Sequence, residues 1–508
     1  MRVEEIIAGL SRPDAYDPPP ARVEVRQTHI SAVFLAGDRV YKVKKPVTLE
    51  FLDYGTLEKR RRFCEEEVRV NRRWAPGVYL GVRPVILRDG RPRLGGEGEA
   101  VEWAVEMRRL PDDHHLLHRV RAGGIDAALA RTLGRRIAEV HAAAERGPEI
   151  ADAARREAVE RNARENLRWA RSVRPSVVER LRARLDETLA ELGPRIDDRA
   201  SRGVPCDTHG DLRLEHVYFF PPGKWAVLDG IECNAALRHA DPVADMAFLV
   251  MDFLHERRRD LADAFADAWF EASGDAEGRR LLPLYVSYRA AVRGKVQDLK
   301  AQEAEVPADE RERSRRRARG FWLLALAALE PPERRPALLL VAGLPGSGKT
   351  TLARALAERA GFEVVRSDVV RKRLAGLPET ARGGDALYAP EFTRRTYAEC
   401  LARAEAILSE AGRVVVDATF GSADERRAFD EVARSWAVPF GVLHCRLAPD
   451  LARERLAARH GDASDADVAV YERMAASWPP FGIEVDTAGD PLPAALEALR
   501  GLGLYPTS

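Results

Sequence analysis

The spacing of hydrophobic and polar positions predicts two parts of the chain with different architectures. Near the N-terminus the pattern alternates in short runs such as "SAVFLAG" and "RVYKVKK", which predict antiparallel strands joined by a turn at Gly37-Asp38. Helical spacing follows over residues 56–74 and through much of 114–328. After residue 336, apolar runs alternate with helical patterns, and this order favours an α/β domain with a parallel sheet.

Prolines mark the change between these two patterns. The stretch "ALEPPERRPALLLVAG" places three prolines between the end of a helix and the start of a short, fully apolar strand. A chain of 508 residues is also too long for a single hydrophobic core. We therefore expect an α+β domain over residues 1–328, a Pro-rich linker over 329–336 and an α/β domain over 337–508.

Composition narrows the possible environments and partners. The chain has 81 Lys and Arg against 80 Asp and Glu, for a net charge of +1, without the basic excess of a non-specific nucleic-acid binder. No apolar run is long enough to span a membrane. The five cysteines form no CxxC pair, so we expect neither disulfides nor a zinc site. These features together favour a cytoplasmic protein; the oligomeric state is left open.

The stretch "GLPGSGKT" matches the phosphate-binding loop pattern in full, and it stands between an apolar strand and a helical pattern. Its glycines allow backbone N–H groups to converge on phosphate oxygens at a helix N-terminus. Lys349 would reach the β- and γ-phosphates, and Thr350 would bind Mg²⁺. The predicted nucleotide-binding residues are Gly343, Leu344, Pro345, Gly346, Ser347, Gly348, Lys349, Thr350 and Thr351.

Three further features of this half suit phosphoryl transfer to a hydroxyl. Asp368 follows a strand in "VVRSDVVRKRL" and could accept the hydroxyl proton, although a carboxylate there could also cap a helix. Asp417 ends the apolar run "RVVVDATF" and suits a magnesium site, or alternatively a contact with substrate. Arg453 and Arg459 lie in an Arg-rich stretch and could neutralise the transferred phosphoryl group, or could be solvated helix residues.

Residues 337–505 resemble P-loop kinases of the polynucleotide-kinase, zeta-toxin, gluconate-kinase and chloramphenicol-phosphotransferase type, on the strength of GLPGSGKTT, SDVVRKRL, VVVDATF and the Arg-rich stretch. The resemblance implies that Asp368 is the catalytic base and that ATP and Mg²⁺ are used. It does not identify the acceptor. The guanine-binding motif NKxD is absent from this half, which favours ATP over GTP.

The N-terminal half contains a second set of candidate phosphate-handling residues. The triplet His209-Gly-Asp211 precedes an apolar run, and Asp229 ends the next strand-like segment. Lys42 lies in an expected strand, suited to hold phosphates, and Glu67 lies on an expected helix as its ion-pair partner. A Lys, a Glu, a catalytic Asp and a metal-binding Asp therefore occur in the order of a protein-kinase-like fold.

This half, over about residues 25–325, resembles the aminoglycoside-phosphotransferase family, with its HGDxxxxN signature, a following aspartate and a DPxxD run that appears here as "HADPVADMAFL". The resemblance implies a two-lobed kinase fold, Asp211 as base, Asp229 as metal ligand and Asp245 as a brace for the catalytic loop. The sequence departs from the signature at His216, where the family has Asn. An imidazole could ligate Mg²⁺ poorly and Mn²⁺ better, so we also treat His216 as a candidate metal ligand.

Two functions remain open from the sequence. In the first, both domains transfer the γ-phosphoryl group of ATP to hydroxyls of a small metabolite such as a sugar or amino sugar. In the second, the N-terminal domain is a nucleotide- or ligand-binding pseudokinase with a regulatory role, and the C-terminal domain is a polynucleotide 5′-hydroxyl kinase. The balanced charge favours a small-molecule acceptor over nucleic acid.

Overall fold

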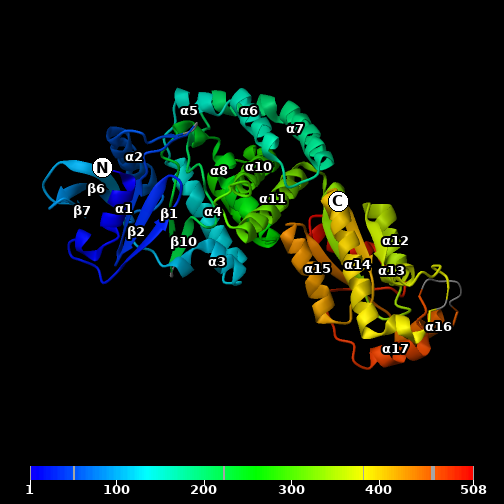
Figure 1. Ribbon diagram of the computed structural model, residues 1–508. Helices are drawn as coiled ribbons and strands as arrows, with labels where there is room; N and C mark the ends of the chain where they lie inside the picture. The colour runs from blue at the N-terminus through cyan, green and yellow to red at the C-terminus, as the bar shows by residue number, and fades with distance from the viewer. Residues whose placement is uncertain (1, 50–51, 221–222, 382, 459–463, 507–508) are drawn as a thin grey trace. The chain divides into compact units, whose positions relative to one another are not determined.

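The computed structural model describes residues 2–49, 52–220, 223–381, 383–458 and 464–506 (Figure 1). The chain forms two compact units, each built from several segments. The first comprises Met1–Glu160, Leu192–Phe253 and Asp260–Tyr285, and the second comprises Arg161–Glu191, Leu254–Arg259 and Val286–Ser508. The sequence predicted a domain boundary at residues 329–336. The division into compact units does not test that boundary, so it stays a prediction.

The first unit begins with helix α1 (Val3–Leu10) and an antiparallel sheet of six strands in the order β1-β2-β3-β8-β6-β7. The expected hairpin joins β2 and β3, with Gly37 in the left-handed region at φ 65°. Helix α2 (Leu57–Arg72) packs on β6 and β8 (Figure 1). The strands are β1 Val23–Gln27, β2 Ser31–Ala36, β3 Arg39–Lys44, β6 Tyr79–Arg88, β7 Arg91–Leu94 and β8 Ala100–Arg108. A short ribbon of β4 (Thr48–Leu49) and β5 (Leu52–Asp53) precedes α2.

Helices and short strand pairs make up the rest of this unit. The antiparallel pair β10–β11 separates the HGD triplet from Asp229, and the pair β9–β12 lies on either side of these two motifs in the sequence. The remaining elements are α3 Leu116–Arg121, α4 Ala127–Ala142, α5 Pro148–Ala153, α6 Arg156–Asn166, β9 Cys206–Asp207, β10 Val217–Phe220, β11 Lys224–Val227, β12 His239–Ala240, α8 Pro242–His255 and α9 Arg259–Ser273. An antiparallel sheet followed by a helical part is the α+β architecture that the sequence predicted.

The second unit combines long helices with the P-loop domain. The helices are α7 Pro175–Ser201, α10 Leu282–Lys300 and α11 Ala308–Leu329, and parts of the first two belong to the first unit. Arg180 on α7 donates from Nε to Oε1 of the buried Glu330 at 2.7 Å, and Trp322 on α11 donates from Nε1 to Asp298 on α10 at 2.8 Å. These contacts hold the helices to one another and to the start of the P-loop domain.

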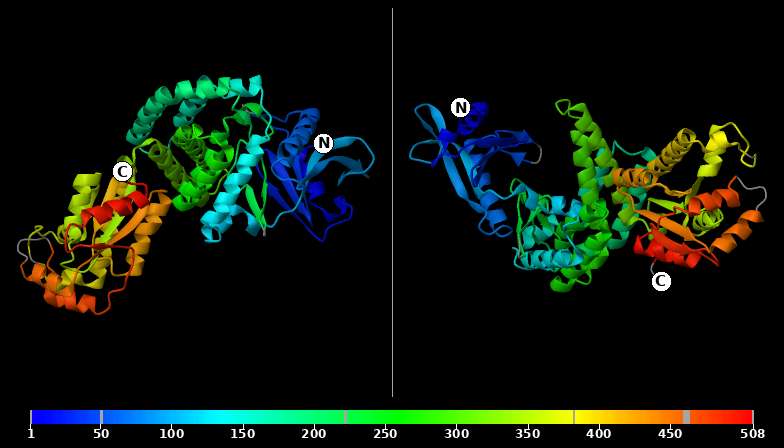
Figure 2. Two further views of the ribbon diagram at one scale, coloured as in Figure 1. Left: turned by 180° about the vertical axis from the view of Figure 1, so that it is seen from behind. Right: turned by 90° about the horizontal axis from the view of Figure 1, so that it is seen from below.

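The P-loop domain is a five-stranded parallel sheet in the order β14-β15-β13-β16-β17, as the alternating pattern predicted. Every residue of β13 is buried. Helices α12 and α18 pack on one face and α14 and α15 on the other (Figure 2). The elements are β13 Ala337–Ala342, α12 Lys349–Ala360, β14 Glu363–Arg366, α13 Ser367–Leu374, α14 Pro390–Ser409, β15 Arg413–Asp417, α15 Ala423–Ser435, β16 Phe440–Arg446, α16 Pro449–Ala457, α17 Val468–Ala475, β17 Ile483–Asp486 and α18 Leu492–Gly501.

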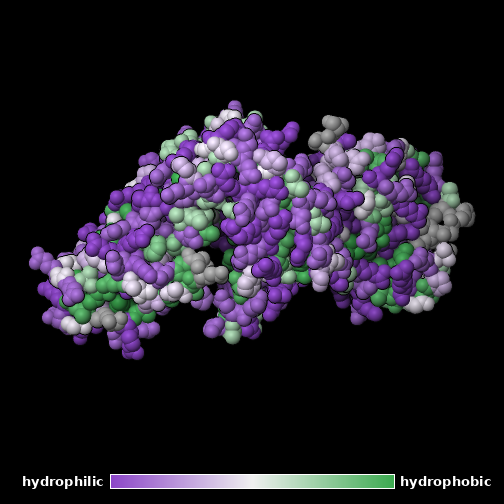
Figure 3. Space-filling view, turned by 90° about the horizontal axis from the view of Figure 1, so that it is seen from above, coloured by the Kyte–Doolittle hydropathy of each residue, from purple (hydrophilic) through white to green (hydrophobic). Residues whose placement is uncertain are grey.

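The surface carries mixed polar and apolar residues, and the face drawn in Figure 3 is mostly hydrophilic. Within the described ranges, no helix is both long enough and apolar enough to cross a membrane.

Candidate functional site

The P-loop joins β13 to α12, and its backbone requires glycine at three positions. Gly343, Gly346 and Gly348 have φ values of 147°, 77° and 85°. A Cβ atom at Gly343 would lie 2.8 Å from the carbonyl oxygen of Cys445, and one at Gly346 would lie 2.9 Å from that of Ala452. Side chains at Gly343 and Gly346 are therefore excluded both by conformation and by close backbone neighbours, and a side chain at Gly348 by conformation. The loop ends at the N-terminus of α12, where backbone N–H groups favour phosphate.

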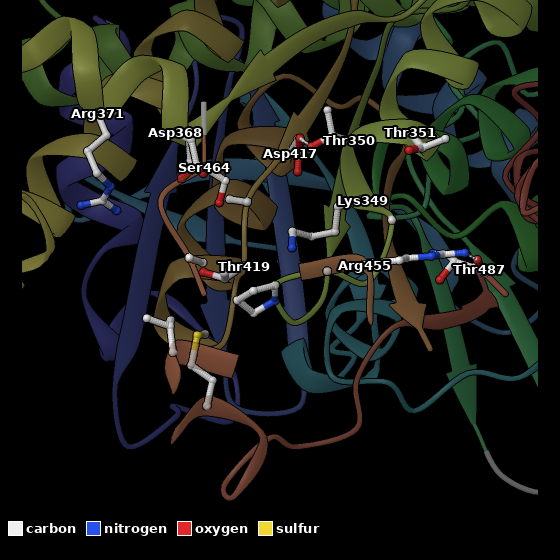
Figure 4. A pocket seen from close by; sticks show the side chains of 18 of the residues that line it. Lys349, Thr350, Thr351, Asp368, Arg371, Asp417, Thr419, Arg455, Ser464 and Thr487 are labelled. Atoms are coloured by element: carbon white, nitrogen blue, oxygen red, sulfur yellow. Dashed lines mark hydrogen bonds between the residues drawn. The ribbon is translucent and has the colours of Figure 1, made fainter. Parts of the chain in front are cut away.

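A cavity of about 810 Å³ lies at the carboxyl ends of the strands and joins the P-loop to Asp368 and Asp417 (Figure 4). Thr350 donates from Oγ1 to Oδ2 of Asp417 at 2.7 Å, and burial raises the pKa of Asp417 although the charge of Lys349 opposes the shift. Residues that line this cavity include Lys349, Thr350, Asp368, Arg371, Asp417, Arg455 and Thr487.

The Thr350 hydroxyl and the Asp417 carboxylate fit a magnesium ion. Mg²⁺ prefers oxygen ligands and is held in kinases by one or two protein oxygens together with substrate phosphates. No group of three or more His, Cys, Asp or Glu residues suited to a metal occurs within the described residues, so a site made wholly of such side chains is not seen there.

Asp368 and Arg371 lie on α13 at the other end of this cavity. Asp368 is in the first turn of α13, whose N-cap is Arg366, so Asp368 is not the capping residue. Arg371 is only 7% exposed; it donates to Thr393 Oγ1 at 3.2 Å, and its Nε atom has no hydrogen-bond partner within the described structure. Asp368 and Arg371 both line the cavity (Figure 4).

The structure separates the predicted arginines of the C-terminal half. Arg453 pairs with Asp450 and Glu472, each at 2.7 Å, and is not among the residues that line the cavity. Arg459 lies outside the described residues. Arg455 does line the cavity, and it donates to the carbonyl oxygen of Thr487 at 3.0 Å. Two residues apart on a helix, Arg453 and Arg455 point to different sides, and the sequence alone did not show which side faces the nucleotide.

Several residues that line the cavity were not predicted from the sequence. Thr487 follows β17 and donates from Oγ1 to the carbonyl oxygen of Ser347 at 2.6 Å, which ties the P-loop to the last strand. On the acceptor side, Tyr397 on α14 and Thr419 after β15 share a hydrogen bond of 3.1 Å. Position at the carboxyl end of a parallel strand was the only available clue for Thr487 and Thr419.

In the N-terminal half, the structure brings Lys42, Glu67 and Asp229 together from β3, α2 and the loop after β11. The Lys42 ammonium lies 3.0 Å from Glu67 Oε1 and 2.8 Å from Asp229 Oδ1. Burial disfavours the charged ammonium, but the charges of Asp229 and Glu67 outweigh it and raise the pKa of Lys42 well above its usual value. The Lys42 charge in turn holds the pKa of Asp229 far below its usual value.

A second lysine, which sequence reasoning missed, shares the same glutamate. Lys44 is completely buried; its ammonium lies 2.6 Å from Glu67 Oε2 and also contacts the carboxylate of Glu232 and the hydroxyl of Tyr54. Alternation along β3 gives Lys42 and Lys44 the same face, which was the signal available in "RVYKVKK". Glu67 thus uses one oxygen for each lysine.

Asp245 holds the backbone of the loop that contains the HGD triplet. Its carboxylate accepts hydrogen bonds from the backbone N–H groups of His209 at 3.0 Å and Gly210 at 2.9 Å. His141 Nε2 lies 3.0 Å from the same carboxylate, and Trp269 donates to His141 Nδ1 at 3.2 Å. Because Nδ1 accepts, the hydrogen of the neutral ring is on Nε2 and points at Asp245.

His216 lies directly beside Asp211. Its Nδ1 atom is 2.9 Å from the Asp211 carbonyl oxygen and 3.6 Å from Asp211 Oδ2. A carbonyl oxygen only accepts, so Nδ1 carries the hydrogen and the neutral ring has its lone pair on Nε2, the atom that could ligate a metal. Arg213, which sequence reasoning did not select, reaches within 4.0 Å of Asp211 Oδ2 and adds a cation beside the candidate base.

A family model described as an AAA domain matches residues 338–481, which covers the P-loop and most of the cavity. This match and the two folds described above confirm both resemblances drawn from the sequence. The sugar kinase of Janibacter sp. HTCC2649 is 22% identical over 34% of this chain and 99% of its own, with a TM-score of 0.25. Amicoumacin kinase is 13% identical over 59% of this chain and 87% of its own, with a TM-score of 0.36. At these TM-scores the two likenesses do not bear on substrate.

Full-length relatives occur in mycobacteria. The uncharacterized protein Rv2004c of Mycobacterium tuberculosis is 34% identical over 486 residues, covering 92% of this chain and 93% of its own. Mb2027c of Mycobacterium bovis matches with the same identity and coverage. The chain therefore belongs to the family of these mycobacterial proteins, and it joins an α+β domain with a kinase-like fold to the P-loop domain that the AAA-domain model matches.

Proposed function

We propose that the chain is a bifunctional phosphotransferase whose two domains each move the γ-phosphoryl group of ATP to a hydroxyl of a small metabolite, such as a sugar or amino sugar. The observation that carries the proposal is the C-terminal cavity, which places the P-loop, the Thr350–Asp417 pair and the carboxylate of Asp368 around one space. Five free cysteines suit a reducing cytoplasm as the place of action.

In the P-loop domain, backbone N–H groups and Lys349 would bind the phosphates of ATP. Thr350 and Asp417 would hold Mg²⁺, which neutralises phosphate charge when bound. Asp368 would take the proton of the acceptor hydroxyl as its oxygen attacks the γ-phosphorus, and ADP leaves. Arg455 would contact the nucleotide.

In the N-terminal domain, Lys42 would anchor the α- and β-phosphates while Glu67 holds it in place. Asp211 would accept the hydroxyl proton, and Asp229 would hold a metal ion, with His216 Nε2 as a possible second ligand. An imidazole ligand favours Mn²⁺ more than an amide oxygen does. We therefore expect this site to accept Mn²⁺ as well as Mg²⁺.

His216 also favours an alternative for this half, because a histidine stands where the related kinases have their asparagine ligand. In that alternative the N-terminal domain binds a nucleotide or another ligand without catalysis and regulates the C-terminal domain, which would be a polynucleotide 5′-hydroxyl kinase. The two functions differ in what Asp211 does.

The test is transfer of radiolabelled phosphate from ATP to a panel of sugars, amino sugars, nucleosides and 5′-hydroxyl oligonucleotides, in Mg²⁺ and in Mn²⁺. The wild type is compared with Lys349→Ala and Asp211→Ala. We expect each variant to lose a different product. If Lys349→Ala abolishes all transfer and Asp211→Ala changes nothing, the N-terminal domain is not a kinase and the bifunctional proposal fails.

A further inference from the structure

Another cavity, here called the α10–α11 pocket, lies among the helices of the second unit. It has a volume of about 330 Å³ and is open to solvent. The segment before α7, helix α10 and helix α11 line it, and its charged lining residues are Arg171, Asp298, Glu312, Arg315 and Arg319. None of these five residues lines the P-loop cavity or belongs to the candidate site of the N-terminal half.

The buried carboxylate of Asp298 joins the three elements at this pocket. Asp298 lies on α10 and is only 2% exposed. One of its oxygens accepts from the Ser172 hydroxyl, and the other accepts from the backbone N–H of Arg171 at 3.0 Å and from the indole N–H of Trp322 on α11 at 2.8 Å. A buried polar group with its hydrogen bonds made fixes the parts that it connects. The backbone of Arg171 is therefore held beside α10 and α11, while its side chain is exposed.

Three guanidinium groups line the α10–α11 pocket, and ion pairs neutralise little of their charge. Arg315 and Arg319 are four residues apart on α11, so they share one face of that helix, and Arg171 comes from the segment before α7. Among the residues that the structure describes, no carboxylate lies within ion-pair distance of Arg171 or Arg319. The Arg319 guanidinium instead lies 4.7 Å from the ring centre of Trp436. Arg315 has an exposed pair with Glu312 at 3.4 Å, which contributes little.

The acids nearby are already engaged. The buried carboxylate uses both oxygens for the contacts described above, and Glu312 also pairs with Arg316 at 3.3 Å. Elsewhere on α11, Arg313 pairs with Asp309 at 2.8 Å. A nucleic-acid strand requires cations spaced along its backbone, whereas two or three guanidinium groups suffice to hold a single phosphate group. The pairing along α11 therefore favours a small anion at the pocket over a polymer.

We propose that the α10–α11 pocket binds a small phosphorylated molecule, whose phosphate dianion is held by Arg171, Arg315 and Arg319. The planar guanidinium group matches a phosphate with two parallel hydrogen bonds, and a dianion between the three cations removes their mutual repulsion. The volume of about 330 Å³ is near the lower end of the range of small-ligand pockets, roughly 300–1,000 Å³. It holds a phosphate with a small attached group, and the opening to solvent leaves space for the rest of the ligand. This site is additional to the phosphotransferase function proposed above.

The experiment is equilibrium dialysis of the full chain with radiolabelled inorganic phosphate, followed by competition with glycerol 3-phosphate or glycerol. The chain carries Lys349→Ala and the buffer contains no divalent metal, so that phosphate binding at the two candidate kinase sites is weakened. Arg171→Gln and Arg319→Gln are tested singly and together, and Arg319→Lys keeps the charge but removes the planar fork. Arg317→Gln, at an exposed position of α11 that does not line the pocket, is the matched control. Because the Arg171 side chain is exposed and makes no ion pair in the described structure, Arg171→Gln should leave the unfolding midpoint without phosphate unchanged.

We expect Arg171→Gln and Arg319→Gln each to weaken phosphate binding about tenfold or more, with a larger loss in the double variant, a smaller one for Arg319→Lys and none for Arg317→Gln. Glycerol 3-phosphate should displace the labelled phosphate, and glycerol should not. Phosphate binding that is as tight in Arg171→Gln and Arg319→Gln as in the starting chain would overturn the inference. If a single-stranded oligonucleotide binds through these arginines with a steep loss of affinity in salt, and glycerol 3-phosphate does not bind, the occupant is nucleic acid and the small-molecule proposal is wrong.

Discussion

The two candidate phosphate sites hold their lysines in different ways. In the P-loop domain, Lys349 donates to the carbonyl oxygen of Leu344, within the same loop, at 2.9 Å. In the N-terminal domain, Lys42 lies between the carboxylates of Glu67 and Asp229, which come from distant parts of the sequence. A P-loop is therefore shaped by consecutive residues, whereas the kinase-like site depends on ion pairs between separate elements.

This difference affects how each site would receive a nucleotide. Phosphate entering the P-loop meets backbone N–H groups and the Lys349 ammonium, which donates to a carbonyl oxygen of the same loop. Phosphate entering the N-terminal site meets a lysine whose charge is already balanced, and a metal ion at Asp229 would share that carboxylate with Lys42. The second site accordingly depends more on its metal, which makes the identity of residue 216 important.

The largest expected effect on activity is at the P-loop. Lys349→Ala, in a chain that also carries Asp211→Ala, should lower transfer by the C-terminal site by about 10²–10³-fold, because a preorganised cation facing the transferred group is lost. The turnover number for ATP checks this. Arg359→Ala, an exposed position on the same helix, is the control and should leave the rate unchanged. A mild effect of Lys349→Ala would place phosphate binding elsewhere in the cavity.

In the N-terminal domain, the ion pairs of both lysines depend on Glu67. Glu67→Gln leaves Lys42 and Lys44 with one fewer negative partner in a buried site, so the free energy of unfolding of this domain should fall by about 3–5 kcal/mol. Calorimetry measures the change. Glu65→Gln, which breaks an exposed pair with Arg61 on the same helix, should cost less than about 1 kcal/mol. Equal effects of the two variants would contradict a structural role for the ion-pair network.

The stability of the N-terminal domain should depend on pH through His209. Burial lowers the pKa of His209 to about 4, and the ring donates from Nε2 to the Leu228 carbonyl oxygen while Nδ1 faces the Asp211 N–H, an arrangement that requires the neutral form. The folded state thus binds fewer protons than the unfolded state. His209 therefore contributes about 3 kcal/mol to the free energy of unfolding. This contribution is fully present above the pKa of the unfolded state, about 6.5, and is lost as the pH falls towards about 4.

The free energy of unfolding, measured between about pH 7.5 and 4.5, roughly the window set by these two pKa values, checks that prediction. In the His209→Gln variant this part of the pH dependence should vanish. His118→Gln, at an exposed position on α3, is the comparison and should keep the dependence. If the wild type and His209→Gln lose stability in parallel, another group carries the effect.

The smallest expected effect concerns the metal. His216→Asn replaces the imidazole by an amide oxygen donor, so the N-terminal site should change its preference from Mn²⁺ towards Mg²⁺ by about tenfold. The readout is nucleotide affinity in each metal, measured in a chain carrying Lys349→Ala. Asp229→Asn should weaken binding in both metals. No change of preference in His216→Asn would show that Nε2 does not reach the metal.

Much of the C-terminal site could be predicted because its information is local. "GLPGSGKT" specifies its own loop through three glycines with positive φ, and an apolar run ending in Asp417 places that carboxylate at the edge of a parallel sheet beside Thr350. The order of Lys42, Glu67, Asp211 and Asp229 along the chain likewise indicated a kinase-like fold. The P-loop motif can be recognised in the sequence because residues next to one another in the chain set the geometry of the loop.

What the sequence by itself determined is the pair of folds and the phosphate loop, and the roles of its carboxylates stay predictions. Only the tertiary structure decided which side of α16 faces the cavity, that Lys44 shares Glu67 with Lys42, and that Asp465 lies against Lys372. The physical reason is that these contacts join residues on different elements, 23 positions apart for Lys44 and Glu67 and 93 apart for Lys372 and Asp465. Periodicity gives a helix or strand its buried face, but partners across such separations are chosen by packing, and a charged side chain enters the interior only where packing supplies its counter-charge.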